Sequence, residues 1–468
     1  MLAAGRSRRF RGTKPKVLYP LCGRPTLVHV LETLRDVHRS APLRAVCIVV
    51  PPGKAIEKAL AGARYPFSLV YAVQRDPRGT GDAAQVGLKK LGGTDEVLVL
   101  AADMPLVRAS SLVQLVRARR EAGAAGALLT ATAPQPPAYG RIVRNEGWIT
   151  GIVEARDATP GQLEIREVNL CTYAFERSAL ERVLPRLQSS NAQGERYLTD
   201  AAAEMVADGH HLTSVDGDLE EVLGTNTRAE LAAVTKVVRD RIVGDLMDAG
   251  VTVADPATTY VDAGVVVGVE TVLRPNTYLE GATRVGSRCE IGPSVQLVDT
   301  TVGDDAVVSF TVAREARIGP EASVGPFTSL RPGTVLARGA KAGTFAELKN
   351  ARIGEEAKVP HFSYMGDVTV GRRSNIGAGT ITSNYDGEDK HSTTIGDDVF
   401  IGSDSILIAP VRVGRGAYTG AGSVVTRDVG AGELVYGVPA TKRVRQSKRK
   451  TAKKSGTAAK RPARKRRA

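Results

Sequence analysis

The first residues of the chain carry groups suited to binding phosphate. The turn Leu2-Ala3-Ala4-Gly5 can offer backbone N–H groups to phosphate oxygens, and Arg9 and Lys16 supply positive charge close by. A lone glycine-bearing turn also fits a tight connection between a strand and a helix. The Lys-Pro-Lys sequence at positions 14–16 favours the phosphate site over that simpler interpretation.

A carboxylate suited to holding a metal lies further along the chain. Asp103 follows the apolar sequence EVLVLAA and precedes Met104-Pro105-Leu106, so we expect it at the carboxyl end of a strand. A carboxylate there can hold Mg2+ against phosphate groups, and phosphoryl transfer needs such charge neutralisation more than covalent help. The alternative role for Asp103 is to cap the helix that follows.

Length and composition predict a soluble protein of several domains. The 468 residues exceed one ordinary core, and 42% apolar with 24% charged residues is a globular balance. No apolar stretch approaches the ~20 residues that cross a bilayer, and the N-terminus lacks the apolar core of a signal peptide. The four cysteines show no metal-type or redox-type spacing, which indicates a reduced, cytoplasmic protein.

The net charge of +14 comes from one end of the chain. Residues 442–468 contain fourteen Lys or Arg and no acid, which leaves 64 − 14 = 50 basic residues against 50 acidic ones elsewhere. We expect these residues to form a disordered basic tail. Weak attraction to polyanions would be incidental, so no specific nucleic-acid partner is predicted.

The first half of the chain alternates apolar and helix-compatible segments. Ala45–Val50, Ser68–Val73 and Glu96–Ala101 have the composition of buried strands. The alternation predicts a parallel sheet flanked by helices, a Rossmann-like layout that binds ligands at the carboxyl ends of its strands. Aliphatic residues at three- and four-residue steps in Thr227–Gly250 predict an amphipathic helix that connects to the second half.

A six-residue repeat begins after Val251. Aliphatic residues recur every six positions in several runs, often with Gly next: Val267, Leu273, Leu279, Val285, Ile291 and Leu297; Ile318, Val324 and Leu330; Val370 and Ile376; Ile395, Ile401, Leu407 and Val413. This period lines the inside of a triangular coil and predicts a parallel β-helix. The polar segment 383–394 is off-register, so we expect a loop expelled from the coil, a natural place for a site.

Motifs in both halves resemble one family. The opening LAAGRSRRF…KPKVL resembles nucleotidyltransferases that join a sugar phosphate to a nucleoside triphosphate, and the repeats carry RPG, HFSYMGD, NIGAGTITSNYDG and IGSDS. Together they resemble the bifunctional UDP-N-acetylglucosamine pyrophosphorylase / glucosamine-1-phosphate N-acetyltransferases. The resemblance covers nearly the whole chain, up to about Pro439. The resemblance implies an enzyme with a pyrophosphorylase domain over 1–226, a linker helix over 227–250, a left-handed β-helix acetyltransferase domain over 251–441 and the tail over 442–468.

The resemblance also implies the reactions and their substrates. The enzyme would acetylate glucosamine 1-phosphate with acetyl-CoA, then transfer UMP from UTP to the product, giving UDP-N-acetylglucosamine and pyrophosphate for peptidoglycan and lipopolysaccharide precursors. Mg2+ is the implied cofactor, and the implied assembly is a homotrimer in the cytoplasm, without a membrane partner.

For uridylyl transfer, the resemblance makes Asn226 the second metal ligand beside Asp103. Gln74, Gly79 and Thr80 would bind the uracil base. The sugar would be held by a further set of residues, namely Gly140, Glu154 and Asn169. Leu2, Ala3, Ala4, Gly5, Arg9 and Lys16 would complete the nucleotide site.

For acetyl transfer, a base must accept the proton of the sugar's amino group, and a neutral imidazole near pH 7 is suited to this. His361 matches the family's catalytic base. Arg331 and Lys349 match its phosphate-binding pair. The remaining matches to the amino-sugar site are Tyr364, Asn375 and Lys390, and those to the coenzyme A site are Ala378, Asn384, Tyr385, Ser403 and Ala421.

The chain departs from the family pattern in several places. Met1 directly precedes Leu2, so we expect the family's first, central strand to be lost, through either a misassigned start codon or a truncation of the chain. Ser7-Arg8-Arg9 stands for Gly-Thr-Arg, Ala101-Ala102 for Tyr-Gly, and Asp82 for a customary His. Gly437 replaces a common Arg, whose role Lys442 or Arg443 could take.

Two alternatives remain at this point. One is a nucleotidylyltransferase of single activity with a purely structural β-helix. The other is a non-catalytic scaffold or nucleic-acid-associated protein that uses the basic tail.

Overall fold

The computed structural model describes residues 1–5, 8–93 and 95–443, so Ser7 and nearly all of the predicted basic tail lie outside the described residues. The chain divides into two compact units. The first comprises Met1–Val265 and Leu279–Gly281, and the second comprises Val266–Tyr278 and the chain from Ala282 onward. None of the described helices is both long and apolar enough to cross a membrane.

The parallel part of the first unit follows the sequence prediction. Strands β3 (Ala45–Val50) and β4 (Ser68–Val73) pair in parallel along their whole length. The first residues of the chain take part in this sheet. Ala3 N–H donates to the Val49 carbonyl (2.8 Å) and Leu2 N–H donates to the Leu100 carbonyl (2.9 Å), so the first residues still bridge two neighbouring segments.

The rest of the sheet structure is mixed rather than parallel. It contains β5 (Glu96–Val99), β6 (Gly126–Thr132), β7 (Arg141–Asn145), β8 (Trp148–Val153), β9 (Glu167–Glu176) and β10 (Leu212–Asp216). β6 and β10 are parallel, whereas β9 runs antiparallel to β5, β6 and β7. The alternation of segments in the sequence did not indicate this antiparallel part. A small antiparallel pair joins β1 (Pro20–Leu21) to β2 (Arg24–Pro25).

Eight helices accompany these strands in the described part of the chain: α1 (Thr26–Ser40), α2 (Ala55–Ala59), α3 (Thr80–Leu88), α4 (Ala109–Glu121), α5 (Pro160–Leu163), α6 (Arg177–Val183), α7 (Asp200–Ala207) and α8 (Arg228–Asp248). The predicted connector is α8. It begins where Thr227 accepts a hydrogen bond from the Glu230 N–H (3.1 Å), which satisfies one of the free donors of the first turn.

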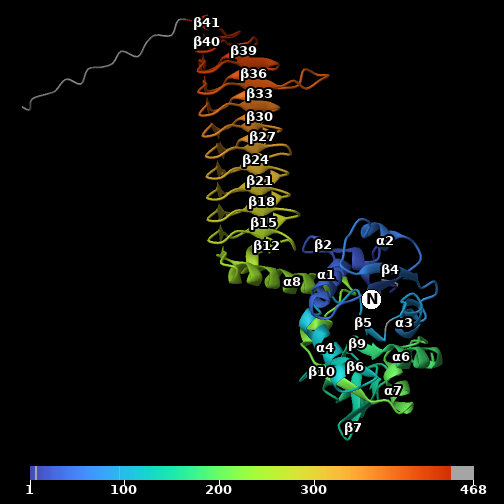
Figure 1. Ribbon diagram of the computed structural model, residues 1–468. Helices are drawn as coiled ribbons and strands as arrows, with labels where there is room; N and C mark the ends of the chain where they lie inside the picture. Colours follow the sequence, from blue (N-terminus) through green and yellow to red (C-terminus); the bar gives the residue numbers. More distant parts are fainter. Residues whose placement is uncertain (6–7, 94, 444–468) are drawn as a thin grey trace, which may run out of the picture. The chain divides into compact units, whose positions relative to one another are not determined.

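The second unit is a parallel β-solenoid, visible as a stack of short strands in Figure 1. One sheet contains β14 (Val272–Leu273), β17 (Glu290–Ile291), β20 (Val307–Val308), β23 (Ser323–Val324), β26 (Lys341–Thr344), β29 (Lys358–His361), β32 (Asn375–Ile376), β35 (Phe400–Ile401), β38 (Tyr418–Thr419), β40 (Leu434–Tyr436) and β41 (Thr441–Arg443). A second contains β18 (Val295–Val298), β21 (Thr311–Arg314), β24 (Thr328–Leu330), β27 (Glu347–Lys349), β30 (Tyr364–Gly366), β33 (Ile381–Ser383), β36 (Ile406–Ile408) and β39 (Val424–Val425). A third contains β13 (Val266–Val267), β16 (Arg284–Val285), β19 (Thr301–Val302), β22 (Arg317–Ile318), β25 (Val335–Leu336), β28 (Arg352–Ile353), β31 (Val368–Val370), β34 (Thr393–Ile395) and β37 (Val411–Val413). Strands β11 (Thr252–Val253), β12 (Thr259–Val261) and β15 (Thr277–Glu280) include residues of the first unit.

The six-residue period builds the interior of the solenoid. Its aliphatic residues are buried and lie in register from turn to turn, as in the column Ile291, Val308, Val324, Ala342 and Val359. The predicted loop also forms. Between β33 and β34 the chain leaves the coil, and the Asp386 carboxylate accepts hydrogen bonds from the N–H groups of Glu388 (2.9 Å) and Asp389 (2.8 Å).

Candidate functional sites

The first unit contains a cavity of about 570 Å³. Eleven of the predicted residues line it, namely Leu2, Ala3, Ala4, Gly5, Arg9, Lys16, Gln74, Gly79, Thr80, Asp103 and Asn226. They come from segments far apart in the chain, from Leu2 to Asn226. The cavity therefore brings the phosphate turn, the expected base-binding loop and the expected metal ligands to one place.

A cation already occupies the position between the two expected metal ligands. The Lys16 ammonium contacts the Asp103 carboxylate and donates to Asn226 Oδ1 (2.6 Å). The side chains of Lys16 and Asp103 are only 13% and 17% exposed. Two oxygen donors that converge on one cation suit Mg2+, which prefers oxygen ligands and keeps several sites for water or phosphate. Among the described residues no group of three or more His, Cys, Asp or Glu could hold a metal, so phosphate and water would have to supply further ligands.

The loop expected to bind the base is held by hydrogen bonds. Gln74 is 4% exposed, and its Nε2 donates to Asp82 Oδ2 (2.7 Å) and to the Gly79 carbonyl (3.2 Å). Asp82 thus has a clear role where a His was expected. Gly79 has φ of +112°, and a Cβ there would overlap the Arg196 carbonyl oxygen. Thr80 Oγ1 accepts a hydrogen bond from Leu198 N–H (2.9 Å), which fixes the start of α3.

The three expected sugar-binding residues lie together but outside the lining of this cavity. Asn169 N–H donates to the Gly140 carbonyl (2.9 Å), and a Cβ on Gly140 would lie 3.7 Å from the Glu154 side chain. Burial raises the pKa of Glu154, although a hydrogen bond from Thr199 (3.0 Å) opposes the shift. The Asn169 amide is engaged internally, because it donates to the Tyr173 hydroxyl (2.7 Å).

Eight further lining residues were not predicted from the sequence, and three of them have polar or charged side chains: Arg156, Gln193 and Glu195. No motif marks them, since they come from loops without a recognisable pattern. Arg156 adds a cation to the cavity wall beside those of Arg9 and Lys16.

In the solenoid, strand register aligns His361 with the expected coenzyme A residues. Lys358 pairs with Asn375, Asn375 pairs with Phe400, and Phe400 pairs with Tyr418, each on the next turn of the coil. The predicted residues follow these four positions at the same short offset along the chain. They therefore form a column at one corner of successive turns, which contains His361, Ala378, Ser403 and Ala421.

The expected phosphate-binding pair forms a second column. Leu330 pairs with Leu348, so Arg331 and Lys349 follow in equivalent positions of neighbouring turns. The Arg331 guanidinium pairs with Glu347 (2.9 Å), and the Lys349 ammonium lies 3.9 Å from the Asp367 carboxylate. Along the chain, the corner that contains His361 comes just before the sheet of β24, β27 and β30. The cationic column, Arg331 and Lys349, lies at the other end of the strands of this sheet.

Asp367 lies among residues of both expected solenoid sites. Its carboxylate accepts from the amides of Asn384 (2.5 Å) and Asn350 (2.8 Å). Burial opposes ionisation, but these bonds and the neighbouring lysines hold the pKa of Asp367 below its ordinary value. The Lys349 side chain lowers the pKa of Lys390 through hydrogen bonding and through its like charge. Asp367 belongs to the HFSYMGD motif, so the sequence did contain a signal for it.

The remaining predicted residues occupy separate places in the solenoid. A Cβ on Gly366 would meet the Tyr364 hydroxyl at 2.6 Å, and Gly366 pairs with Lys349 of the preceding turn. Asn375 lies in β32, on the sheet of His361. Tyr385 is exposed in the expelled loop, where its hydroxyl donates to the Gly387 carbonyl (2.5 Å). Lys442, expected to replace a missing Arg, pairs with Glu433 (2.5 Å).

Comparison with known proteins identifies the family. Residues 1–162 match the MobA-like NTP transferase domain, and residues 392–427 match the bacterial transferase hexapeptide (six repeats). The "Bifunctional protein GlmU" of Thermobifida fusca is 46% identical over 93% of this chain and 90% of its own length. The protein of the same name from Mycolicibacterium vanbaalenii is 45% identical over 93% of this chain and 89% of its own length. The chain belongs to the GlmU family.

Membership confirms the enzyme class inferred from the motifs. GlmU proteins combine an acetyltransferase with a uridylyltransferase that gives UDP-N-acetylglucosamine, and both family models fit the corresponding parts of this chain. The single-activity alternative and the scaffold alternative are therefore wrong.

Among solved structures, the chain is similar to a UDP-glucose pyrophosphorylase complexed with UDP-glucose. The match covers 51% of this chain and 97% of that one, with a TM-score of 0.42 and 16% sequence identity.

Proposed function

We propose that the cavity of the first unit carries out uridylyl transfer from UTP to N-acetylglucosamine 1-phosphate. The observation that carries the proposal is the convergence of Asp103 and Asn226 on one cation position inside a cavity lined by Gly5 and Lys16. Mg2+ bound by these two oxygens would neutralise triphosphate charge. Lys16 would move from the metal position to a phosphate oxygen, and Arg9 would add a second cation.

In this proposal the hydrogen-bonded loop selects the nucleotide. The Gln74 side-chain NH2 group donates a hydrogen bond to Asp82, which orients the side chain. The Gln74 side-chain carbonyl can then accept a hydrogen bond from a base. Gly79 and Thr80 allow the base to approach the backbone at the start of α3. In the proposal the sugar is bound by Gly140, Glu154 and Asn169, which lie close to one another. The test is pyrophosphate release from UTP, which must require both N-acetylglucosamine 1-phosphate and Mg2+.

We propose further that the solenoid acetylates glucosamine 1-phosphate with acetyl-CoA. The observation that carries this proposal is the alignment of His361 with Ala378, Ser403 and Ala421 at one corner, which gives a thioester chain a straight track past an imidazole. His361 would accept the proton that the attacking amine loses. Asn384 and Tyr385 would bind coenzyme A from the expelled loop.

The sugar phosphate would be held by the cationic column. Arg331 and Lys349 lie on successive turns, and Lys390 joins Lys349 beside Asp367. Tyr364 and Asn375 would orient the sugar ring. Loss of the acetyl-CoA thioester must depend on glucosamine 1-phosphate, and a protein that hydrolyses acetyl-CoA equally without the sugar would contradict the assignment.

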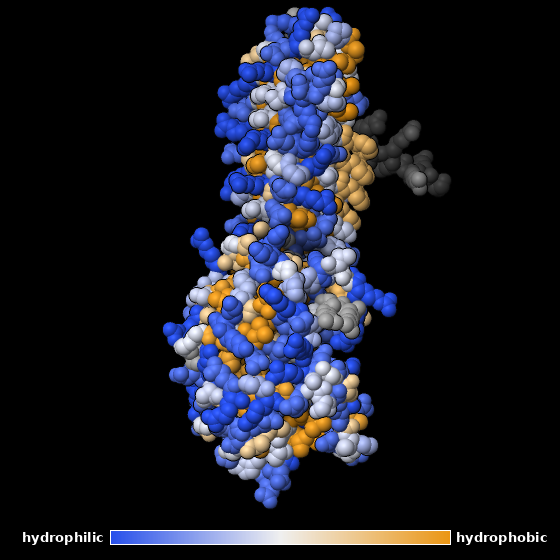
Figure 2. Space-filling model, turned by 90° about the vertical axis from the view of Figure 1, so that its right-hand side faces the viewer, coloured by the Kyte–Doolittle hydropathy of each residue, from blue (hydrophilic) through white to orange (hydrophobic). Residues whose placement is uncertain are grey.

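We propose that the chain is a homotrimer and acts in the cytoplasm, where UTP and acetyl-CoA are found. Figure 2 shows apolar side chains gathered along one edge of the solenoid. Phe310, Phe327, Phe345 and Phe362 are all exposed, and the centroids of successive rings lie 5.2–5.3 Å apart. Monomers rarely expose a contiguous apolar strip of this kind, which favours association through the solenoid. Sedimentation that gives a monomer at micromolar concentration with full acetyl transfer would contradict the trimer.

A further inference from the structure

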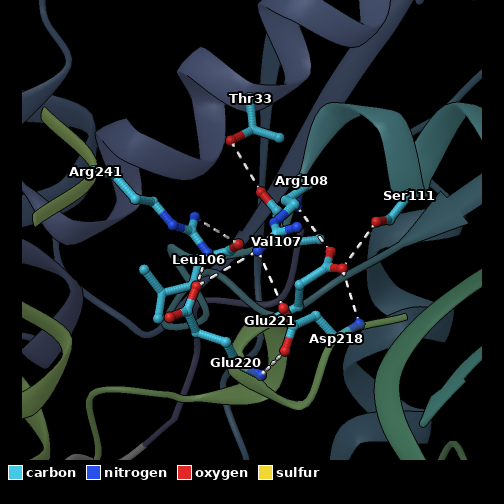
Figure 3. Close-up of polar contacts among 9 residues, drawn as sticks. All are labelled: Thr33, Leu106, Val107, Arg108, Ser111, Asp218, Glu220, Glu221 and Arg241. Atoms are coloured by element: carbon cyan, nitrogen blue, oxygen red, sulfur yellow. Dashed lines mark hydrogen bonds and ion pairs between the residues drawn. The ribbon is translucent and has the colours of Figure 1, made fainter. Parts of the chain in front are cut away.

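A polar network in the first unit joins residues 106–111 to residues 218–221 (Figure 3). Its centre is Glu221, a residue only 3% exposed. A buried carboxylate is costly unless hydrogen bonds compensate for its lost hydration. Its Oε2 accepts from Arg108 N–H (2.9 Å), and its Oε1 accepts from the Ser111 hydroxyl (2.9 Å) and from Asp218 N–H (3.3 Å).

Glu221 caps two helices at once. It closes a capping box with Asp218 around the short 3₁₀ helix η4 (Leu219–Val222), in which it sits itself. It also bonds the first turn of α4, whose own N-cap residue, Arg108, provides no side-chain cap. The carboxylate is thus stabilised by the positive end of α4, and α4 is tied to η4.

The two tied segments carry the expected metal ligands. Asp103 lies five residues before Arg108, and Asn226 lies five residues after Glu221. The segments are joined at one end by the Arg108–Glu221 bond. At the other end, Thr225 N–H donates to the Asp103 carbonyl (3.0 Å). The spacing between Asp103 and Asn226 is therefore fixed from both ends of the pair of segments.

Two helices hold the middle of this arrangement. Arg241 of α8 pairs with Glu220 and donates to the Leu106 carbonyl (3.1 Å). Thr33 of α1 donates to the Val107 carbonyl (3.3 Å). None of these side chains lines the cavity, so their effect on a bound cation must act through Asp103 and Asn226.

We propose that Glu221 is a positioning residue for uridylyl transfer, which sets the distance between the Asp103 and Asn226 oxygens that hold the cation. This inference rests on the proposed uridylyl function of the cavity. Partners that orient metal ligands without touching the metal typically change metal affinity or activity about 10- to 100-fold when removed.

The test compares Glu221→Gln with the full-length wild-type protein. Mn2+ is the probe, and its binding in the presence of UTP is measured by electron paramagnetic resonance, which needs no turnover. We expect Mn2+ affinity to fall about tenfold or more and the Mg2+ concentration for half-maximal uridylyl transfer to rise by a similar factor. Acetyl transfer, measured on the same sample, should not change. Ser111→Ala removes one bond to Glu221 and should shift both values in the same direction by a smaller factor.

Glu96→Gln is the matched control. Glu96 is a carboxylate of 15% side-chain exposure that binds Arg119 and Arg120 at the other end of α4, away from η4. The proposal is overturned if Glu221→Gln binds Mn2+ like the wild type, or if Glu96→Gln weakens binding equally. If Glu221→Gln does not fold, an unchanged Mn2+ affinity in Ser111→Ala overturns it instead. Failure of the proposed function is distinct, because the wild-type protein itself would then release no pyrophosphate from UTP.

Discussion

The two units assemble their sites by different means. In the first unit the cavity joins residues as distant as Leu2, Gln74 and Asn226, which meet because separate segments fold against each other. In the solenoid, the column that runs from His361 to Ala421 takes one residue from each successive turn, and the pairing of the strands sets its register. A site built from repeats depends on nearest neighbours, whereas the cavity depends on contacts between loops. Changes in the first unit should therefore disturb structure and chemistry together more often than changes in the solenoid.

The largest expected effect tests the solenoid, where removal of a side chain should remove only chemistry. His361→Ala should lower the kcat of acetyl transfer by about 100- to 10,000-fold, because the amine loses its general base. The KM for glucosamine 1-phosphate should stay near its original value, since in the proposal Arg331 and Lys349 bind the phosphate. Steady-state kinetics of thioester loss give both quantities.

Uridylyl transfer and the unfolding temperature should not change in His361→Ala. The control is His211→Ala, an exposed histidine of the first unit, which should leave both activities intact. If His361→Ala keeps more than about a tenth of its kcat, the barrier has changed by only ~1.4 kcal/mol and another group is the base.

The second effect tests whether chemistry in the cavity can be separated from chemistry in the solenoid. Asp103→Asn should slow Mg2+-dependent uridylyl transfer by at least about a hundredfold, because a ligand charge that offsets the metal is lost and metal stabilisation of phosphoryl transfer is worth several kcal/mol. Acetyl transfer should be unchanged in the same sample. Asp95→Asn, an exposed carboxylate before β5, is the control. Equal loss of both activities would show misfolding rather than a metal role.

The third effect tests the coupling of structure and chemistry in the cavity. Gly79 has φ of +112°, and an added Cβ would overlap the Arg196 carbonyl. Gly79→Ala should therefore cost about 1–3 kcal/mol of unfolding free energy in the first unit and raise the KM for UTP. Gly92→Ala, with nothing within 4 Å of the added Cβ, should do neither. Denaturant unfolding measures the free energy of unfolding, and uridylyl kinetics measure the KM for UTP. A change in only one of these two quantities in Gly79→Ala would contradict the coupling.

The smallest expected effect concerns how the stability of the first unit depends on pH. Burial, with the charges of Glu154, Asp157 and Glu204, raises the pKa of Asp200 to about 6 from 3.8. The folded state therefore favours the protonated acid, so its contribution to stability is present below about pH 4 and is lost as the pH rises through about 6. Asp200→Asn should raise the unfolding temperature of the first unit at pH values above this range, and should leave it unchanged at pH values below the range. Calorimetry that shows an equal gain on both sides of the range would exclude titration of Asp200 as the cause.

The accuracy of the sequence prediction also differs between the units. The period of six requires an aliphatic residue at each inward position, so the solenoid could be inferred from spacing alone. In the first unit the strands Ala45–Val50 and Ser68–Val73 were predicted with their correct bounds. The antiparallel strand β9 was not, because local composition does not reveal the direction of a strand relative to its neighbours.

The sequence by itself determined the repeat fold, the family and the chemical groups at both sites, because these depend on residue type and on spacing along the chain. Only the tertiary structure decided which groups meet. It brought Lys16 between Asp103 and Asn226, engaged Gln74 with Asp82, and tied Glu221 to the backbone of Arg108. These contacts join segments far apart in the chain, and their free energies depend on burial and distance, which no local pattern encodes.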